Sequence, residues 1–206
     1  MEPTENFRKT FFPQAGAYSG YAMKVRFNPK KTGCAGCPVL CRKIGQGQEI
    51  IPEYETVSHF GALNANSDLD AIIEANRICN ELGLDTISTA STIACYAELE
   101  GRTVPPAEML QILREIADRK PGRGDALAEG SLRYAALQGH PEVSMSVKGL
   151  ELPAYDPRGA YGMALAYATS NRGGCHLSAY PVSHEILRRP VATDRFSFDG
   201  KARIVR

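Results

Sequence analysis

The chain has no segment that would place it in a membrane or in the secretory pathway. Its 206 residues contain no apolar run long enough to span a bilayer and no apolar signal segment near the start. Basic and acidic side chains almost balance, at 24 against 23, so the composition gives no broad electrostatic footprint for nucleic acid or an anionic membrane. Tryptophan and internal repeats are absent. These absences favour a cytoplasmic globular protein with no membrane or nucleic-acid partner.

What is present is an ordinary globular composition with one unusual cluster of thiols. Hydrophobic residues make up 43% of the chain and charged residues 23%, enough to bury a core in one large domain or two small ones. Cys34, Cys37 and Cys41 follow the spacing C-x2-C-x3-C. Clustered thiols in a chain without a secretory signal indicate a reducing compartment and metal binding rather than disulfides.

The spacing of these three cysteines favours a metal centre. Thiolates held at one point select zinc, copper(I) or an iron–sulfur cluster. The small residues Gly33, Ala35 and Gly36 allow the backbone to curl around a bulky centre. Zinc and a four-iron cluster each require a fourth ligand, which must come from elsewhere. We therefore expect the three sulfurs to converge, with buried free thiols as the alternative, and we expect Cys79 and Cys95 in helical cores away from them.

Helical periodicity dominates the middle of the chain and predicts a mainly α, multihelical fold. We expect helices near 68–82, 88–100, 107–119, 125–137 and 160–170. Ser67 is the expected N-terminal cap of the first helix, and Gly83 is expected to end it. Residues 1–32 are predicted to form loops and short extended pieces, and residues 145–152 fit an extended segment.

Two carboxylates after Pro52 are candidates for acid–base chemistry. Glu53 and Glu55 flank Tyr54, and His59 follows four residues further on. A carboxylate in a loop of low charge can have a raised pKa and serve as a general acid or base. A solvated loop glutamate is the alternative interpretation.

Two further loops carry polar groups suited to ligand binding. Residues 83–88 join two predicted helices, and their backbone N–H groups together with Asp85 could bind a polar ligand. A capped helix–helix turn is the alternative. Residues 172–176 place a flexible Gly-Gly backbone beside His176, whose imidazole titrates near neutral pH. For a lone histidine, a structural role is the alternative.

Together these segments resemble the tungsten-containing aldehyde ferredoxin oxidoreductase family. The resemblance is carried, in the family's order, by Cys34-x2-Cys37-x3-Cys41, Pro52-Glu53-Tyr54-Glu55-Thr56, Asn80-Glu81-Leu82-Gly83-Leu84-Asp85-Thr86-Ile87-Ser88, Leu152-Pro153-Ala154-Tyr155-Asp156-Pro157-Arg158-Gly159 and Tyr167-Ala168-Thr169-Ser170-Asn171-Arg172-Gly173-Gly174-Cys175-His176. These motifs cover nearly the whole chain, and their joint pattern is highly specific although each alone is weak.

The resemblance implies a domain organisation and two metal cofactors. Family members have an N-terminal β-rich domain and two helical domains. They hold tungsten, sometimes molybdenum, between two pterin dithiolenes beside one four-iron (4Fe-4S) cluster. This chain resembles the first helical domain over 1–150, with the cluster cysteines, and the truncated start of the second over 151–206. By this resemblance it lacks the β-rich N-terminal pterin domain and the late segment that carries the fourth cluster cysteine and the second pterin loop.

The resemblance also implies roles for individual residues. The three ligands of the cluster found in this chain would be Cys34, Cys37 and Cys41. The family's first pterin motif, Asp-x-x-Gly-Leu-Asp, falls on Asn80, Gly83, Leu84 and Asp85. An asparagine stands here in place of the aspartate. It can still hydrogen-bond the pterin ring, but without the negative charge that strengthens such a bond. The positions near the tungsten and the substrate are matched by Glu55, Tyr155 and His176.

Some family members hold a bridging metal at a dimer interface with a Glu-x-x-His motif. The matching stretch here is Glu74-Ala75-Asn76-Arg77. Arginine does not ligate a metal, so we do not expect this metal site, and a homodimer remains an open alternative.

The implied reaction is oxidation of an aldehyde, with water, to a carboxylic acid. Two electrons would leave through tungsten and pass through the cluster to ferredoxin. By the resemblance, Glu55 would activate water or move the substrate proton, His176 would be the partner acid, and Tyr155 would hydrogen-bond the carbonyl oxygen. The alternatives are an aromatic acyl-CoA or carboxylate/hydroxyacid reductase subunit of the same family, and a zinc-stabilised helical binding module. On its own, the chain is expected to be inactive.

Overall fold

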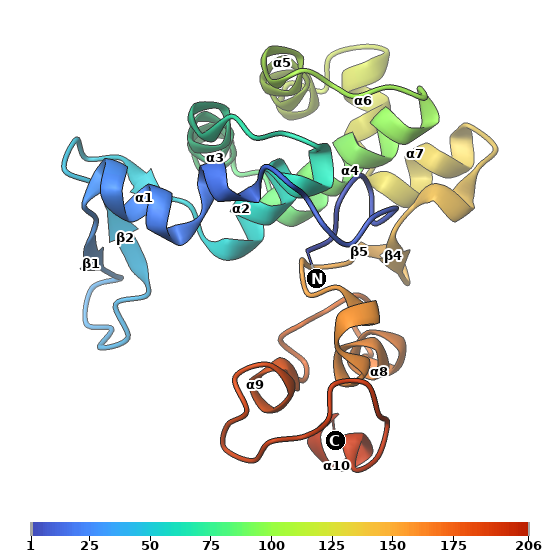
Figure 1. The fold of residues 1–206 in the computed structure, drawn as a ribbon. Coiled ribbons are helices and arrows are strands. Elements are labelled where there is room, and N and C mark those ends of the chain that lie inside the picture. Colours follow the sequence, from blue (N-terminus) through green and yellow to red (C-terminus); the bar gives the residue numbers. More distant parts are fainter. Residues whose placement is uncertain (1, 206) are drawn as a thin grey trace.

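Helices account for most of the regular structure in the computed structural model, which describes residues 2–205 (Figure 1). The α-helices are α1 (Gly20–Phe27), α2 (Tyr54–Phe60), α3 (Leu69–Leu82), α4 (Thr86–Leu99), α5 (Pro106–Ala117), α6 (Arg123–Ala128), α7 (Ser131–Leu137), α8 (Tyr161–Thr169), α9 (Val182–Glu185) and α10 (Lys201–Val205). Short 3-10 helices are η1 (Ala15–Tyr18), η2 (Ala62–Asn64), η3 (Pro141–Val143) and η4 (Pro157–Gly159). The predicted mainly α fold class is confirmed.

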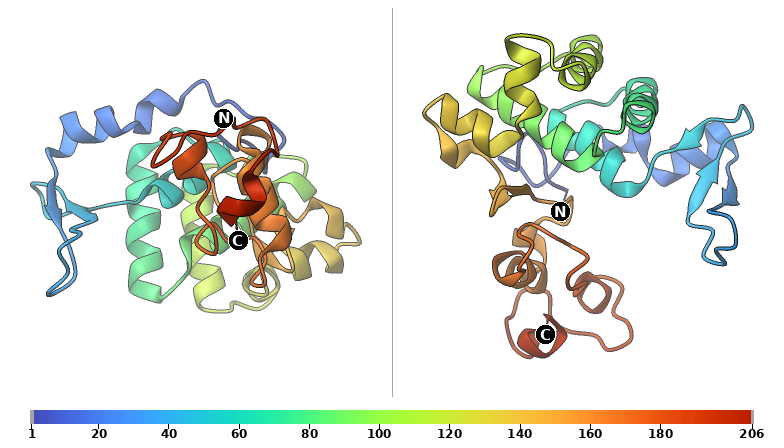
Figure 2. Two further views of the ribbon diagram at one scale, coloured as in Figure 1. Left: turned by 90° about the horizontal axis from the view of Figure 1, so that it is seen from below. Right: turned by 180° about the vertical axis from the view of Figure 1, so that it is seen from behind.

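Two small antiparallel sheets complete the fold. The first contains β1 (Lys30–Thr32), β2 (Arg42–Ile44) and β3 (Ile50–Ile51), paired in that order. The second is a hairpin of β4 (Ser146–Val147) and β5 (Leu150–Glu151), within the segment 145–152 for which the sequence fits an extended conformation. In Figures 1 and 2 the first sheet projects from one side of the helical body.

Helix α3 begins one residue later than the capping pattern predicts. Its N-cap is Asp68, whose carboxylate accepts the backbone N–H groups of Asp70 and Ala71, so the assignment of Ser67 as cap is wrong. The side chain of Asn66 accepts the N–H of Asp68 at 2.8 Å and fixes that residue in the capping position. Gly83 ends the helix as predicted, with φ at +71°, a conformation that glycine adopts without strain.

The single helix predicted over 125–137 is wrong, because the chain forms α6 and α7 with a break between them. Gly130 lies at the break with φ at +87°, outside the helical region. The N-terminus of α7 is satisfied from a distant element, since Glu151 Oε1 accepts the N–H of Ser131 at 3.0 Å and its hydroxyl at 2.8 Å. That carboxylate is only 4% exposed, so it acts as a buried tertiary cap.

Two helices lie where the sequence predicts loops. Helix α1 occupies part of the 1–32 stretch, and Ser19 caps it by accepting the N–H of Ala22. Helix α2 contains Tyr54 and Glu55, so the candidate carboxylate lies in a helix and not in a loop. Both helices are short, at 8 and 7 residues, and two turns give too few positions to establish a helical period.

The main core surrounds α4, which contacts α2, α5, α6 and α7. Its largest fully buried apolar side chains include Phe60, Ile72, Ile93, Met109, Ile112 and Leu113. Each contributes about 1.5–3 kcal/mol relative to an exposed side chain. Cys79 and Cys95 are buried in α3 and α4, as predicted.

The C-terminal helices form a smaller cluster beside this body. Ala160, Met163, Tyr167 and Val182 pack together there, and Figure 2 shows α8, α9 and α10 as a group on one side. The domain boundary between residues 150 and 151 stays a prediction. None of the helices described within residues 2–205 combines the length and the apolar character needed to cross a membrane.

Candidate active site

Three side chains of α2 contact the backbone of the segment that follows β5. Tyr54 donates its hydroxyl to the carbonyl of Ala154 at 3.1 Å, and Glu55 Oε2 accepts the N–H of the same residue at 2.7 Å. One turn later, His59 Nε2 lies 3.1 Å from the carbonyl oxygen of Leu152. Residues about a hundred positions apart in the sequence therefore form one structural unit.

The predicted acid–base pair meets in this unit. Glu55 Oε1 lies 3.8 Å from His176 Nε2, and their side chains are 15% and 18% exposed. That distance is too long for a direct hydrogen bond. Glu55 Oε1 is buried without any hydrogen-bond partner, which leaves an acceptor pointing toward the imidazole. His176 lines a cavity, whereas Glu55 is not among the residues that line the cavities beside His176 or Tyr155, so the carboxylate lies behind the imidazole.

The environment of Glu55 suits proton transfer near neutral pH. Burial raises the pKa of its carboxyl to about 7, an effect that the N–H of Ala154 opposes and the charge of Asp85 reinforces. Burial lowers the pKa of the His176 imidazole, and the nearby Arg172 cation lowers it further. At neutral pH this carboxyl can therefore act as a base or an acid, opposite a neutral imidazole.

His59 links α2 to the segment after β5 through two backbone carbonyl groups next to the site. The side chain is completely buried, and its Nδ1 lies 2.7 Å from the backbone oxygen of Glu55. With Leu152 on the other side, both ring nitrogens face carbonyl oxygens, which only accept hydrogen bonds. Burial lowers the pKa of this imidazole, while the two carbonyl contacts raise it. His59 follows Glu55 by one helical turn, a relation hidden when the segment is interpreted as a loop.

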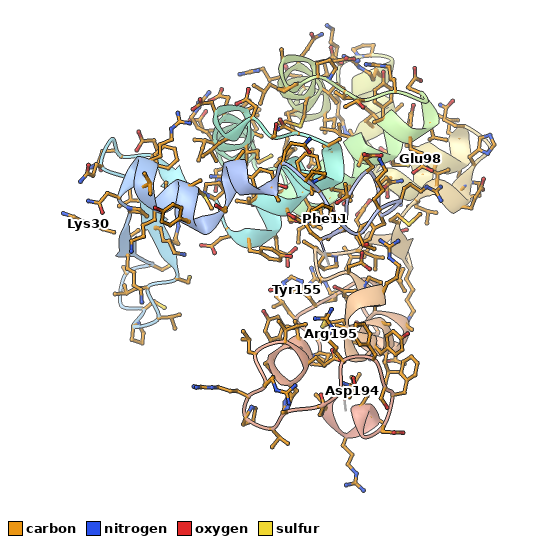
Figure 3. All side chains as sticks on the ribbon, in the orientation of Figure 1. Phe11, Lys30, Glu98, Tyr155, Asp194 and Arg195 are labelled. Carbon is orange, nitrogen blue, oxygen red and sulfur yellow. The ribbon has the colours of Figure 1, made fainter. Side chains whose placement is uncertain are left out.

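Aromatic rings enclose the third predicted residue. The ring of Tyr155 lies 5.4 Å from that of Tyr54 and 5.7 Å from that of His176, between centroids. Its hydroxyl shares a hydrogen bond of 2.7 Å with Tyr180, a residue for which the sequence gives no signal. Figure 3 shows Tyr155 between the helical body and the C-terminal helices. The structure thus brings Glu55, Tyr155 and His176 together.

A cavity of about 370 Å³ is lined by His176 and by one residue of the predicted pterin motif, Asp85. Asp85, the N-cap of α4, and Ser88, in the first turn of α4, line it together with Arg172. Asp85 caps α4 by accepting the N–H of Ser88 at 2.7 Å through Oδ2. The carboxylate is exposed, so it retains capacity to accept hydrogen bonds from a ligand.

The other residues of that motif lie outside the cavity lining. Asn80 donates to the carbonyl of Asn76 at 2.7 Å and borders a different pocket, while Gly83 and Leu84 border neither. A carboxylate, a hydroxyl and a guanidinium facing one cavity fit a polar heterocycle with donors and acceptors on its edge, such as a pterin. The residues present therefore fit the implied pterin group through Asp85 rather than Asn80.

Cys175 also lines this cavity, and the sequence gives it no role beyond the family motif. The thiol is 4% exposed, and Arg172 Nη1 lies 3.5 Å from its sulfur. Burial acts to raise the pKa of this thiol, but hydrogen bonds from Ser178, Leu177 and Arg172 outweigh it and bring the pKa to about 7. The guanidinium next to a cysteine in the Arg-Gly-Gly-Cys-His motif is the signal that could have identified it.

The cysteine loop lies elsewhere, between β1 and β2, and does not form a metal-binding group. The loop does curl: the N–H of Cys37 donates to the carbonyl of Cys34 at 3.0 Å, and Gly36 has φ at +76°. However, Cys34 and Cys41 are exposed and Cys37 is half-buried. Within residues 2–205, no three Cys, His, Asp or Glu side chains gather as metal ligands.

The expected convergence of the three sulfurs is therefore not met in this structure. None of these cysteines lines the cavity beside His176, so the expectation that this loop adjoins the site is not supported either. Neither a cluster nor a zinc ion finds a preassembled ligand set here. The assignment of Cys34, Cys37 and Cys41 as ligands stays a prediction.

Comparison with known proteins supplies the family. A family model described as "Aldehyde ferredoxin oxidoreductase, domains 2 & 3" matches residues 1–206. The chain is 45% identical, over 94% of its length, to a tungsten-containing aldehyde ferredoxin oxidoreductase of Pyrococcus furiosus, and 46% identical over 94% to one of Thermococcus kodakarensis. It is also 30% identical, over 69% of its length, to an aliphatic sulfonate oxidoreductase, WOR-like subunit, of Pyrococcus furiosus.

The chain spans 35% of the length of each of the first two relatives. Its matched region is the one that the family description assigns to domains 2 and 3, and the structure of this region is mainly helical. The chain belongs to the tungsten-containing aldehyde ferredoxin oxidoreductase family.

Proposed function

We propose that the chain is part of an oxidoreductase that converts an aldehyde and water to a carboxylic acid, with ferredoxin as electron acceptor. The observation that carries this proposal is the pairing of Glu55 and His176. A buried carboxylate oxygen without a partner lies 3.8 Å from an imidazole nitrogen, and the ring of Tyr155 packs against that imidazole. This arrangement suits the addition of water to a carbonyl followed by proton removal.

In the proposed reaction, each of the three side chains has one task. Glu55, with its pKa near neutral, accepts a proton from water or from the substrate carbon. His176 donates a hydrogen bond on the opposite side of the bound group. The hydroxyl of Tyr155 donates to the carbonyl oxygen of the substrate, while its own oxygen accepts a hydrogen bond from the hydroxyl of Tyr180.

A tungsten or molybdenum ion between two pterins would supply the redox chemistry when bound. In this chain, Asp85 would hold one pterin edge by accepting hydrogen bonds from it, next to Ser88 and Arg172. The predicted cluster ligands do not assemble, so we assign no step to the cluster. Beside the site, the rings of Tyr54 and Tyr155 pack against each other with 5.4 Å between their centroids.

A related reaction on another substrate is the second candidate. The relative named for aliphatic sulfonates indicates that this scaffold serves more than one substrate class. An aromatic acyl-CoA or carboxylate/hydroxyacid reductase would use the same acid–base pair in the opposite direction. The pairing of Glu55 with His176 does not distinguish these reactions, but turnover does.

The test is an anaerobic assay of the complete enzyme against aldehydes, acyl-CoA esters and alkanesulfonates. We expect turnover with aldehydes, and a loss of turnover in Glu55→Gln with unchanged tungsten and iron content. The matched control is Glu53→Gln, because Glu53 is an exposed neighbour two residues away. Turnover with acyl-CoA esters or sulfonates alone would contradict the proposal.

A further inference from the structure

Charge is distributed very unevenly along this nearly neutral chain. No Asp or Glu occurs between Glu5 and Glu49. The same stretch contains eight cations: Arg8, Lys9, Lys24, Arg26, Lys30, Lys31, Arg42 and Lys43. Elsewhere, acidic residues outnumber basic ones, so the near balance of the whole chain conceals a basic segment.

Most of these cations lie together on the projecting part of the molecule. Lys24 and Arg26 are on α1, and Lys30, Lys31, Arg42 and Lys43 are on β1 and β2; all are exposed. We name residues 24–43 the basic hairpin. It extends away from the helical body in Figures 1 and 2, and Figure 3 shows Lys30 at its outer edge.

The cations of the basic hairpin repel one another and have few acidic partners in this chain. Lys31 lies directly opposite Lys43 in the β1–β2 register, and like charges in that position repel. Among the described residues of the basic hairpin, only Arg26 forms an ion pair, with Asp70. On the helical body, by contrast, Arg77 and Arg114 share Glu74.

The tip of the basic hairpin is apolar. Val39 is 69% exposed and Leu40 is 42% exposed, in the loop between the two cationic strands. An exposed apolar point bordered by one sign of charge is typical of a surface that is steered by electrostatics and then docks by burial. Both features favour a partner that is itself a protein with a complementary, acidic surface.

We propose that the basic hairpin is the docking surface for an acidic protein that accepts electrons from the enzyme. This inference rests on the proposed function, because it names the partner of that reaction by its charge. A nucleic acid fits less well, since its phosphates would require cations that continue along the body, and several arginines there are engaged with carboxylates.

The test uses Lys31→Glu in the complete enzyme, because this change places a carboxylate opposite Lys43 and removes a repulsion within the fold. A weaker interaction with the partner therefore cannot be attributed to a destabilised hairpin. With a purified ferredoxin of low isoelectric point, we expect KM at low salt to rise about fivefold. The rate with a small viologen dye should not change.

Two variants and one condition serve as controls. Lys31→Arg keeps the charge and should retain the wild-type KM. Arg133→Glu reverses an exposed charge on α7, far along the chain from the basic hairpin, and should also leave KM unchanged. At about 1 M salt, where the screening length is about 3 Å, the difference between Lys31→Glu and wild type should disappear.

The kinetics would overturn the proposal if KM were unchanged in Lys31→Glu, if Arg133→Glu had an equal effect, or if Lys31→Glu lost iron in place of changing KM. Binding of the same ferredoxin measured by calorimetry separates this inference from the proposed function. If the enzyme oxidises no aldehyde but ferredoxin binding still depends on Lys31, only the proposed function fails. If Lys31→Glu instead abolishes binding to phosphatidylglycerol vesicles and leaves ferredoxin binding intact, the surface is a membrane contact and the inference is wrong.

Discussion

At the scale of single residues, the site depends on one carboxylate between two imidazoles. Glu55 Oε1 faces His176, and Glu55 Oε2 lies 3.8 Å from His59 Nδ1. The sequence is sufficient to nominate Glu55 and His176, because the family motifs contain them. It does not reveal the structural role of His59, because that role depends on the carbonyl of Leu152, about ninety residues away.

The raised pKa of Glu55 predicts a particular pH profile. The carboxyl must be ionised to accept a proton, so turnover should rise as pH increases through about 7. Glu55→Gln should remove this rise and lower turnover by roughly 10²–10⁴-fold, the usual contribution of a general base. Initial rates from pH 5.5 to 8.5 for wild type and Glu55→Gln would check it, and a profile that keeps its inflection in the variant would contradict it.

The same pKa affects stability in the opposite sense to an ion-paired carboxylate. Folding raises the pKa from 4.5 to about 7, so the folded state holds its proton more tightly than the unfolded state. The free energy of unfolding should therefore fall by about 3 kcal/mol as pH rises through this window, and Glu55→Gln should lack that fall. Urea denaturation at pH 5 and pH 8 measures both; equal slopes in the two proteins would exclude this assignment.

His59→Phe should fill the buried space but remove the one hydrogen bond that the neutral imidazole can donate to a carbonyl oxygen. We expect a loss of about 1–3 kcal/mol in the free energy of unfolding, because a buried acceptor is left unsatisfied. Since the segment that presents the N–H of Ala154 to Glu55 is then less firmly held, kcat should fall more than KM rises. A variant that is destabilised with normal kcat would limit His59 to a structural role.

At the scale of elements, the success of sequence-based prediction follows from where the hydrogen-bond partners lie. Helix α3 has an apolar stripe of four turns, a local cap and a terminal glycine, so its limits are predictable to within one residue. The break between α6 and α7 is not predictable in this way, because its cap is Glu151 from β5. Helix α2 is too short to show a period, and its position depends on contacts with distant residues.

The tertiary cap gives a prediction for α7. Glu151→Ala should leave the buried N–H of Ser131 without a partner and its hydroxyl with Ser144 alone, at a cost of about 1–3 kcal/mol. For a chain of this size, that corresponds to a decrease in Tm of roughly 2–12 °C. Glu129→Ala is the control, since its ion pairs with Arg119 and Arg133 are exposed and contribute little. Equal effects of the two changes would show that the buried cap has no special importance.

At the scale of the whole molecule, the acid–base pair and the cysteine loop behave differently. Glu55, Tyr155 and His176 meet through contacts between α2 and the segment after β5, all made within this chain. The loop of Cys34, Cys37 and Cys41 lies on a projecting hairpin and has no comparable partner within the described residues. The sequence could identify both motifs. Among the described residues, however, only the acid–base residues contact the groups that they are expected to act with.

This difference predicts how the chain responds to iron. A four-iron cluster needs four ligands, and the three thiols of this chain are not held together before metal binding. Ordering the loop would therefore consume part of the binding free energy. We expect anaerobic reconstitution of the chain alone with iron and sulfide to give weak, easily chelated iron binding. In the complete enzyme, Cys37→Ala should remove iron, whereas His176→Ala should depress turnover and leave iron and tungsten content unchanged. Tight, stoichiometric cluster binding by the chain alone would show that the hairpin can assemble its own ligand set, contrary to the exposure of Cys34 and Cys41.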